Sequence, residues 1–162
     1  MKYKEILNES IPRTLYHGSK HDLPIGTVLL PGIFTKSLKT IRLTEKILNK
    51  FKPRSYLART KSVFMTDDPT IIERVGGNTD YIFKVVPNGL VEKNNVGWWN
   101  QINSEIRMFL KYGGTTQTIC PYDFEEMAVS YWKGSPCENG FWEYRVSSAT
   151  IIERIKDKEK LK

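Results

Sequence analysis

The sequence has few of the residues on which several classes of protein depend. Its 162 residues include two cysteines and two histidines, too few for a disulfide scaffold or a histidine-rich metal centre, so we expect no metal site. No apolar run approaches the ~20 residues that cross a bilayer. The first ten residues carry charges where a signal peptide has its apolar segment. We therefore expect a cytoplasmic protein with no membrane partner.

The composition is otherwise that of an ordinary globular protein. Hydrophobic residues make up 40% and charged residues 27% of the chain, both near the average for soluble domains. The length suits one domain, and the sequence contains no internal repeat or low-complexity linker. Because the predicted helices interrupt the predicted strands irregularly, we expect a single α+β domain over residues 1–162 rather than a regular βαβ sheet.

Hydrophobic periodicity and turn residues predict the individual elements. Strands are expected over residues 13–16, 62–66, 81–86 and 141–146, with a short strand inside 23–34. Helices are expected over residues 2–9, 38–52, 70–75, 96–112 and 124–132. The charged tail, residues 150–162, is expected to be a helix or a fraying end.

Basic residues are concentrated in the first half of the chain, which has a net charge of +7. Between residues 36 and 61 Glu45 is the only acid. Such a density of positive charge attracts nucleic acid, an anionic cofactor or a phosphorylated partner. The alternative is a solvated helix face opposite apolar residues that face the core. The basic residues are Lys36, Lys39, Arg42, Lys46, Lys50, Lys52, Arg54, Arg59 and Lys61.

Two polar residues are candidates for chemistry. His17 follows a predicted strand beside Gly18, where an imidazole reaches the hydroxyl groups of a ligand, although a histidine at a strand end is often structural. Glu143 lies between Trp142 and Tyr144 in a predicted strand. A carboxylate held among aromatic rings stabilises a developing positive charge. Strand alternation alone instead favours a Glu143 that faces solvent while its neighbours face the core.

Three segments, taken in order, resemble the ADP-ribosyltransferase fold. They are residues 16–19 (YHGS), residues 62–66 (SVFMT) and Glu143. The similarity is to the His-Tyr-Glu branch of that family, which includes diphtheria toxin and the small bacterial rifampicin ADP-ribosyltransferases. The matching motifs cover about a dozen residues, whereas the implied topology covers residues 13–155. The resemblance implies a split antiparallel β-sheet core with flanking helices, and NAD as a substrate.

The resemblance also implies roles for individual residues. His17 would hold the ribose next to nicotinamide, Gly18 would offer backbone groups to the carboxamide, and Ser19 would support that turn. Phe64 takes the position of an aromatic residue that stacks on nicotinamide, where the family usually has tyrosine. Glu143 would lie near the ribose 2′-hydroxyl and stabilise the oxocarbenium-like state as the bond to nicotinamide breaks.

Three further positions follow from their place beside these motifs. Thr66 and Asp67 come directly after the middle strand and are expected to line the pocket. Arg59 is expected to meet the NAD pyrophosphate as a fork-shaped donor. The acceptor of ADP-ribose is unidentified. The opening residues 1–9 look like the starts of small proteins of large tailed bacteriophages, which would suit an effector that modifies a host protein.

Other functions are compatible with the same residues. A basic nucleic-acid-binding protein would use Lys36 to Lys61 for phosphates and Trp98, Trp99 or Tyr56 for base stacking. A catalytically inactive member of the same fold would serve as an interaction or virion component, which the phenylalanine at position 64 favours. An RNA 2′-phosphotransferase-like activity would explain the basic excess, but the arginine set for that chemistry is not evident.

Overall fold

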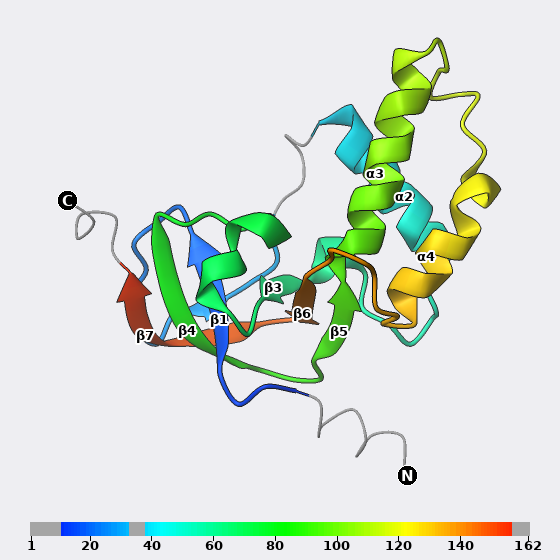
Figure 1. Ribbon diagram of the computed structural model, residues 1–162. Coiled ribbons are helices and arrows are strands. Elements are labelled where there is room, and N and C mark those ends of the chain that lie inside the picture. The colour runs from blue at the N-terminus through cyan, green and yellow to red at the C-terminus, as the bar shows by residue number, and fades with distance from the viewer. Residues whose placement is uncertain (1–10, 33–37, 157–162) are drawn as a thin grey trace.

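The structure is a computed structural model, and it describes residues 11–32 and 38–156 (Figure 1). The helix expected over residues 2–9 and the basic residue Lys36 lie outside these ranges. Within them, no helix has both the length and the apolar character needed to cross a membrane. The elements form an α+β arrangement of two antiparallel sheets and a group of helices.

The first sheet has four antiparallel strands in the order β1-β4-β7-β2. These strands are β1 (Leu15–Ser19), β2 (Val28–Leu29), β4 (Tyr81–Pro87) and β7 (Ala149–Lys156). The prediction of a helix or fraying end for the C-terminal tail is wrong between residues 150 and 156. Ala149 and Ile151 alternate into the core, and the segment pairs with β4 on one side and β2 on the other.

The second sheet has three antiparallel strands in the order β3-β6-β5. They are β3 (Val63–Met65), β5 (Glu92–Asn95) and β6 (Trp142–Val146). The sheets meet at one bridge, where Tyr16 and Thr66 exchange backbone hydrogen bonds of 2.8 and 2.9 Å. The strands that carry His17, Phe64 and Glu143, namely β1, β3 and β6, are therefore consecutive neighbours across the two sheets.

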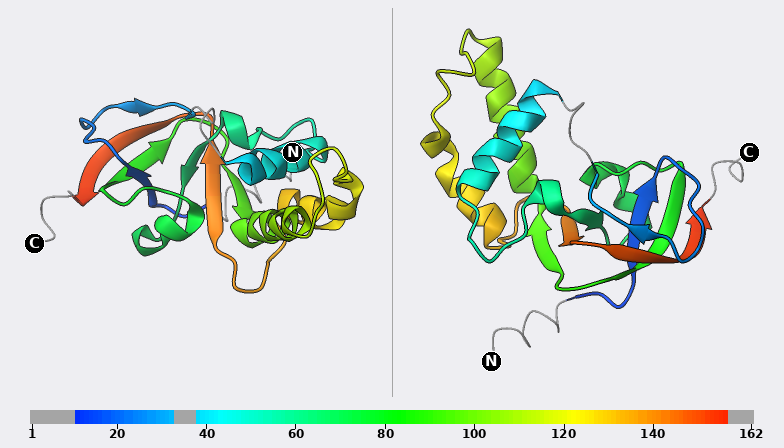
Figure 2. Two further views of the ribbon diagram at one scale, coloured as in Figure 1. Left: turned by 90° about the horizontal axis from the view of Figure 1, so that it is seen from above. Right: turned by 180° about the vertical axis from the view of Figure 1, so that it is seen from behind.

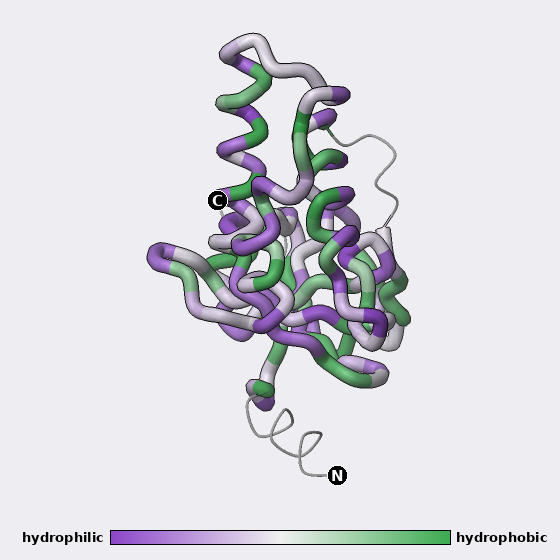
Figure 3. The backbone as a smooth tube through the Cα atoms, turned by 90° about the vertical axis from the view of Figure 1, so that its right-hand side faces the viewer, coloured by the Kyte–Doolittle hydropathy of each residue, from purple (hydrophilic) through white to green (hydrophobic). Residues whose placement is uncertain are grey.

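Three α-helices gather on the side of the second sheet away from the first (Figures 1 and 2). They are α2 (Lys39–Lys50), α3 (Val96–Lys111) and α4 (Glu125–Trp132), in agreement with three of the predicted helices. Hydrophilic and hydrophobic segments alternate along the helices at the top of Figure 3. Ile47, Ile102 and Ala128 are among the buried residues that join the three helices into one core.

Short 3-10 helices fill the connections. They are η1 (Arg59–Lys61), η2 (Pro69–Ile71), η3 (Glu73–Val75) and η4 (Pro121–Phe124). The helix expected over residues 70–75 is thus two 3-10 turns. Asp68 opens the first by accepting a hydrogen bond from the backbone N–H of Thr70 at 2.8 Å, and Gly76 ends the second with a φ of 86°.

A polar layer separates two hydrophobic cores. Val63, Met65, Tyr144 and Val146 project from the second sheet into a core shared with the first sheet. The opposite face of the same strands carries polar side chains and is covered by the helices. Those side chains belong to Glu92, Asn94, Glu143 and Arg145, each at most 8% exposed. The prediction that Glu143 faces solvent is therefore wrong, because helices cover the face that alternation assigned to water.

Candidate functional site

A cavity of about 590 Å³ lies where the two sheets part. Its wall is formed by the end of β1, by β3, by one side of α2, by the first turn of α3 and by residues 72–78. The volume is within the range of ~300–1,000 Å³ typical of ligand pockets. Five of the eight residues expected at the NAD site line it: His17, Gly18, Arg59, Phe64 and Thr66.

His17 is held in one tautomer by a neighbouring strand. Its Nδ1 lies 2.8 Å from the backbone carbonyl oxygen of Phe64. Because a carbonyl only accepts hydrogen bonds, Nδ1 carries the proton and Nε2 keeps a free lone pair. Burial lowers the pKa of His17 below its usual value, and the bond to Phe64 offsets part of this effect. The imidazole is thus neutral near pH 7 and is an acceptor for hydroxyl groups.

Gly18 presents backbone groups at the opening between the sheets. Tyr16 bonds to Thr66 across the bridge, so the backbone alternation of β1 places the N–H and C=O of Gly18 on that same edge, away from β4. No described residue pairs with Gly18 on this edge. A Cβ at Gly18 would overlap the carbonyl oxygen of Asn78 and the side chain of Ile72. The cavity wall therefore has one free donor and one free acceptor at a position that requires glycine.

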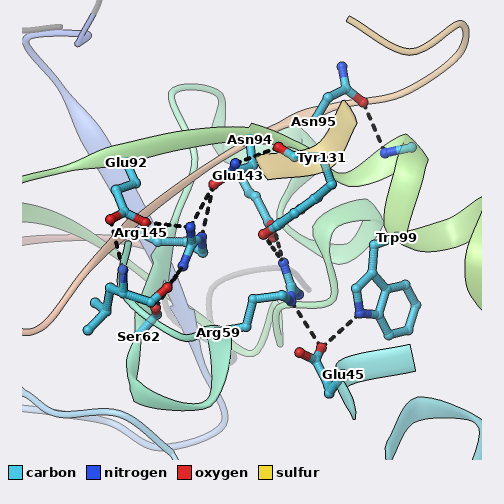
Figure 4. A network of polar contacts seen from close by, with 12 residues as sticks. Glu45, Arg59, Ser62, Glu92, Asn94, Asn95, Trp99, Tyr131, Glu143 and Arg145 are labelled. Atoms are coloured by element: carbon cyan, nitrogen blue, oxygen red, sulfur yellow. Dashed lines mark hydrogen bonds and ion pairs between the residues drawn. The ribbon is translucent and has the colours of Figure 1, made fainter. Parts of the chain in front are cut away.

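Arg59 stands at the centre of a buried polar cluster beside the cavity (Figure 4). Its Nε donates to Glu45 Oε1 at 3.0 Å, and its Nη1 donates to the Tyr131 hydroxyl at 2.6 Å and to Glu143 Oε1. The guanidinium carbon lies 4.7 Å from the centre of the Phe64 ring. Burial lowers the pKa of Arg59, but Glu143, Tyr131 and Glu45 more than offset this and hold that pKa well above its usual value.

Glu143 lies behind Arg59 and does not line the cavity. Its side chain is fully buried, and its Oε1 also accepts a 2.6 Å hydrogen bond from the Tyr131 hydroxyl. Its Oε2 has no hydrogen-bond partner among the described residues. Burial holds the pKa of Tyr131 far above its usual value, so this phenol stays a donor. Arg59 thus lies between Glu143 and the cavity, since it bonds to Glu143 and lines the cavity wall.

A second buried arginine, Arg145, lies on the same face of the sheet. Its Nη2 donates to Glu92 Oε2 at 2.6 Å, and its Nε donates to Asn94 Oδ1 at 3.0 Å. Its Nη1 donates to the Leu57 carbonyl at 2.7 Å and to the Ser62 hydroxyl at 3.2 Å. This cluster ties β5, β6 and the segment before β3 together, and Arg145 does not line the cavity.

Besides Glu143, two residues expected at the site lie outside the cavity lining, namely Ser19 and Asp67. The Ser19 hydroxyl accepts a hydrogen bond from the backbone N–H of His21 at 3.0 Å. Asp67 is exposed and accepts a 3.5 Å hydrogen bond from the Tyr144 hydroxyl. Burial, together with the Asp67 carboxylate, raises the pKa of Tyr144 to about 12.

The cavity wall also includes Glu45 and Trp99, neither of which was expected at an NAD site. The indole Nε1 of Trp99 donates to Glu45 Oε1 at 2.8 Å. A signal for Glu45 was present: it is the single acid of the basic run, and helical spacing places it on the same face of α2 as Ile41 and Leu48. A carboxylate on the buried face of a helix needs a partner, which here is Arg59.

The basic residues of α2 that were expected to bind phosphates lie on the surface, whereas the aromatic residues expected to stack on bases pack toward the interior. Lys39, Arg42, Lys46 and Lys50 are exposed on α2, and the Lys50 ammonium lies 4.8 Å from the centre of the Tyr122 ring. The three aromatic residues expected to stack on bases pack inward instead. Trp98 donates to the Ser135 carbonyl at 2.9 Å, Trp99 bonds to Glu45, and Tyr56 packs on Trp132.

Comparison with known proteins adds no family assignment. No protein-family model matches the chain, and no curated protein is significantly similar to it. The chemistry of the cavity therefore has to be inferred from its own groups. These are a neutral imidazole acceptor, a free backbone donor and acceptor, an aromatic ring and a carboxylate paired with a guanidinium.

Proposed function

We propose that this protein is an NAD-dependent ADP-ribosyltransferase, which breaks the bond between nicotinamide and ribose and transfers ADP-ribose to an acceptor. The arrangement of strands supports this proposal. Together the sheets form one antiparallel array in the order β5-β6-β3 followed by β1-β4-β7-β2. A single bridge joins β1 to the end of β3, and the two sheets part beyond it. His17, Phe64 and Glu143 lie on β1, β3 and β6, three consecutive strands of that array.

The observation that carries the proposal is the free edge of Gly18. A primary carboxamide, such as that of nicotinamide, has an N–H donor and a C=O acceptor side by side. The N–H and C=O of Gly18 offer the complementary pair at the opening of the split. A small ring that bonds there lies in the cavity lined by His17 and Phe64. The edge of β1 thus suits recognition of a carboxamide-bearing ring.

Other groups of the cavity wall suit the ribose and the flat face of the nicotinamide ring. The free Nε2 of His17 accepts a hydrogen bond from a hydroxyl, which fixes the orientation of a sugar beside the carboxamide. The Phe64 ring supplies an apolar face, and the guanidinium of Arg59 already lies over this ring. Because Nε and Nη1 of Arg59 bond to carboxylates, a pyrophosphate at this arginine would compete with Glu45 and Glu143.

The proposal is tested by measuring nicotinamide release from NAD by the purified full-length chain, alone and with a cell lysate that supplies acceptors. His17→Ala should lower the rate about 100-fold, since the ribose loses the acceptor that orients it. His21→Ala is the matched control, because His21 is exposed and its side chain lies outside the cavity lining. Thermal unfolding of each variant confirms that it is folded.

Two results would refute the proposal: no nicotinamide release in either condition together with no NAD binding by calorimetry, or release that survives His17→Ala. The exposed basic face of α2 would then be the feature to explain. Nucleic-acid binding by Lys39, Arg42, Lys46 and Lys50 is recognised by a steep loss of affinity with added salt.

A further inference from the structure

The cavity has a carboxylate of its own, which comes from a helix and not from β6. Glu45 lies on α2 and lines the cavity wall, with 10% of its side chain exposed. Its Oε1 accepts hydrogen bonds from Trp99 Nε1 at 2.8 Å and from Arg59 Nε at 3.0 Å. These two donors fix the plane of the carboxylate, and both bond Oε1, while none of the residues drawn in Figure 4 bonds Oε2. Glu45 thus combines a fixed orientation with one unoccupied oxygen at the cavity.

Glu143 differs from Glu45 in its access to the cavity. It is fully buried, it is absent from the cavity wall, and its Oε1 is occupied by both Arg59 and Tyr131. A ligand in the cavity reaches Glu143 only after Arg59 leaves its place over the Phe64 ring, where the guanidinium is also paired with Glu45. No such movement is needed for a ligand to reach Glu45.

The charges around Arg59 favour a positive group in the cavity. One guanidinium faces two carboxylates, Glu45 and Glu143. The cluster is buried, so the surplus negative charge is screened less than it would be in water. A positive charge that develops next to Glu45 is therefore stabilised by a group that is already oriented and needs no rearrangement.

We propose that Glu45 is the carboxylate that stabilises the ribose as nicotinamide departs, and that Glu143 is a positioning residue that holds Arg59. This inference rests on the proposed function and names a residue for it. The C1′–N bond breaks, its electron pair leaves with nicotinamide, which becomes neutral, and the positive charge passes to the ribose beside Glu45. Water or an acceptor group then forms the new bond at C1′, and its proton goes to solvent.

The test compares Glu45→Gln with Glu105→Gln by steady-state nicotinamide release from NAD. The glutamine at position 45 retains a carbonyl oxygen for Trp99 and Arg59 but has no charge. We expect kcat to fall about 100-fold while KM changes less than about 3-fold, because the charge acts on the transition state more than on bound NAD. Glu105 is an exposed glutamate of α3 outside the cavity lining, and its substitution should change neither constant.

The outcomes separate this inference from the proposed function. If the wild-type chain releases nicotinamide and Glu45→Gln releases it equally fast, Glu45 has no such role, while the proposed function stands. If the wild-type chain neither binds NAD nor releases nicotinamide, both are overturned. Should Glu45→Gln not fold, Trp99→Phe replaces it, since this change removes one of the two donors that orient Glu45 and leaves every charge in place. A kcat unchanged by Trp99→Phe would then refute the inference.

Discussion

Two buried arginines lie on one polar face of the second sheet, and their surroundings differ. Arg145 makes five hydrogen bonds, has one carboxylate partner in Glu92, and lies away from the cavity. Arg59 makes three hydrogen bonds, faces two carboxylates, and lines the cavity. Both clusters are built from the same kinds of group. They differ in charge balance and in contact with open space.

The difference separates a structural role from a chemical one. A buried ion pair whose charges balance and whose hydrogen bonds are complete holds strands together but has nothing left for a ligand. A cluster with a surplus carboxylate beside a cavity keeps unsatisfied charge where a ligand can meet it. In this protein the Arg145 cluster joins β5 to β6, and the Arg59 cluster is the one that a ligand in the cavity can contact.

The largest expected effect is the loss of stability when one carboxylate is removed from each arginine cluster, which tests how the charges in the two clusters balance. Glu92→Gln should lower the free energy of unfolding by about 3–5 kcal/mol, because it leaves Arg145 as a buried charge without a counter-charge. Glu143→Gln should cost less than about 2 kcal/mol, because Glu45 still balances Arg59 and the new amide retains an oxygen for Arg59 and Tyr131. Urea unfolding measures both. Equal losses would show that the two clusters are equally balanced.

A middle-sized effect tests the link between Arg59 and Glu143. Tyr131→Phe removes the hydroxyl that donates to Glu143 at 2.6 Å and accepts from Arg59 at 2.6 Å. Since both partners are charged, we expect a loss of about 1.5–3 kcal/mol in the free energy of unfolding. Tyr122→Phe, at an exposed tyrosine, is the control and should stay within about 0.5 kcal/mol of the wild type. If Tyr131→Phe and Tyr122→Phe changed the free energy of unfolding equally, the Tyr131 hydroxyl would not stabilise the cluster.

The smallest expected effect is a dependence of the free energy of unfolding on pH, caused by His17 in the cavity wall. Burial lowers the native pKa of His17, so the unfolded chain, with a histidine pKa of about 6.5, binds the proton more readily. The free energy of unfolding should therefore fall as the pH drops below about 6.5, by at most about 1.4 kcal/mol per pH unit, until the native pKa is reached. His17→Gln, whose amide can still donate to the Phe64 carbonyl, should lack this contribution. If the free energy of unfolding of the wild type and of His17→Gln depended on pH in the same way, this prediction would be wrong.

Local sequence patterns predicted much of the fold. The three α-helices, β3, β4 and β6 agree with their expected ranges to within a few residues. β5 was missed because its segment, Glu92–Asn95, is entirely polar; Glu92 and Asn94 are buried through their bonds to Arg145. β7 was misassigned because its charges suggested an exposed tail, whereas its strand pairing comes from the distant β2 and β4.

The site was predictable only in part, because it depends on pairing between distant strands. His17 and Phe64 were selected from motifs, but their contact joins residues 47 positions apart. Periodicity correctly put Glu143 and Tyr144 on opposite faces of β6, yet it gave no information about what covers each face. Glu45 was visible as one acid among many bases, but its partners Arg59 and Trp99 become apparent only once α2, α3 and the segment before β3 are packed together.

The single bridge between Tyr16 and Thr66 is the point at which the two sheets part. Within the described residues its two backbone hydrogen bonds are those that join the sheets, which otherwise meet through side chains of their shared core. The cavity lies beside this bridge, and residues of both β1 and β3 line it. A ligand that spans the split should therefore slow the hydrogen–deuterium exchange of the Tyr16 and Thr66 amides and leave exchange within β4 unchanged.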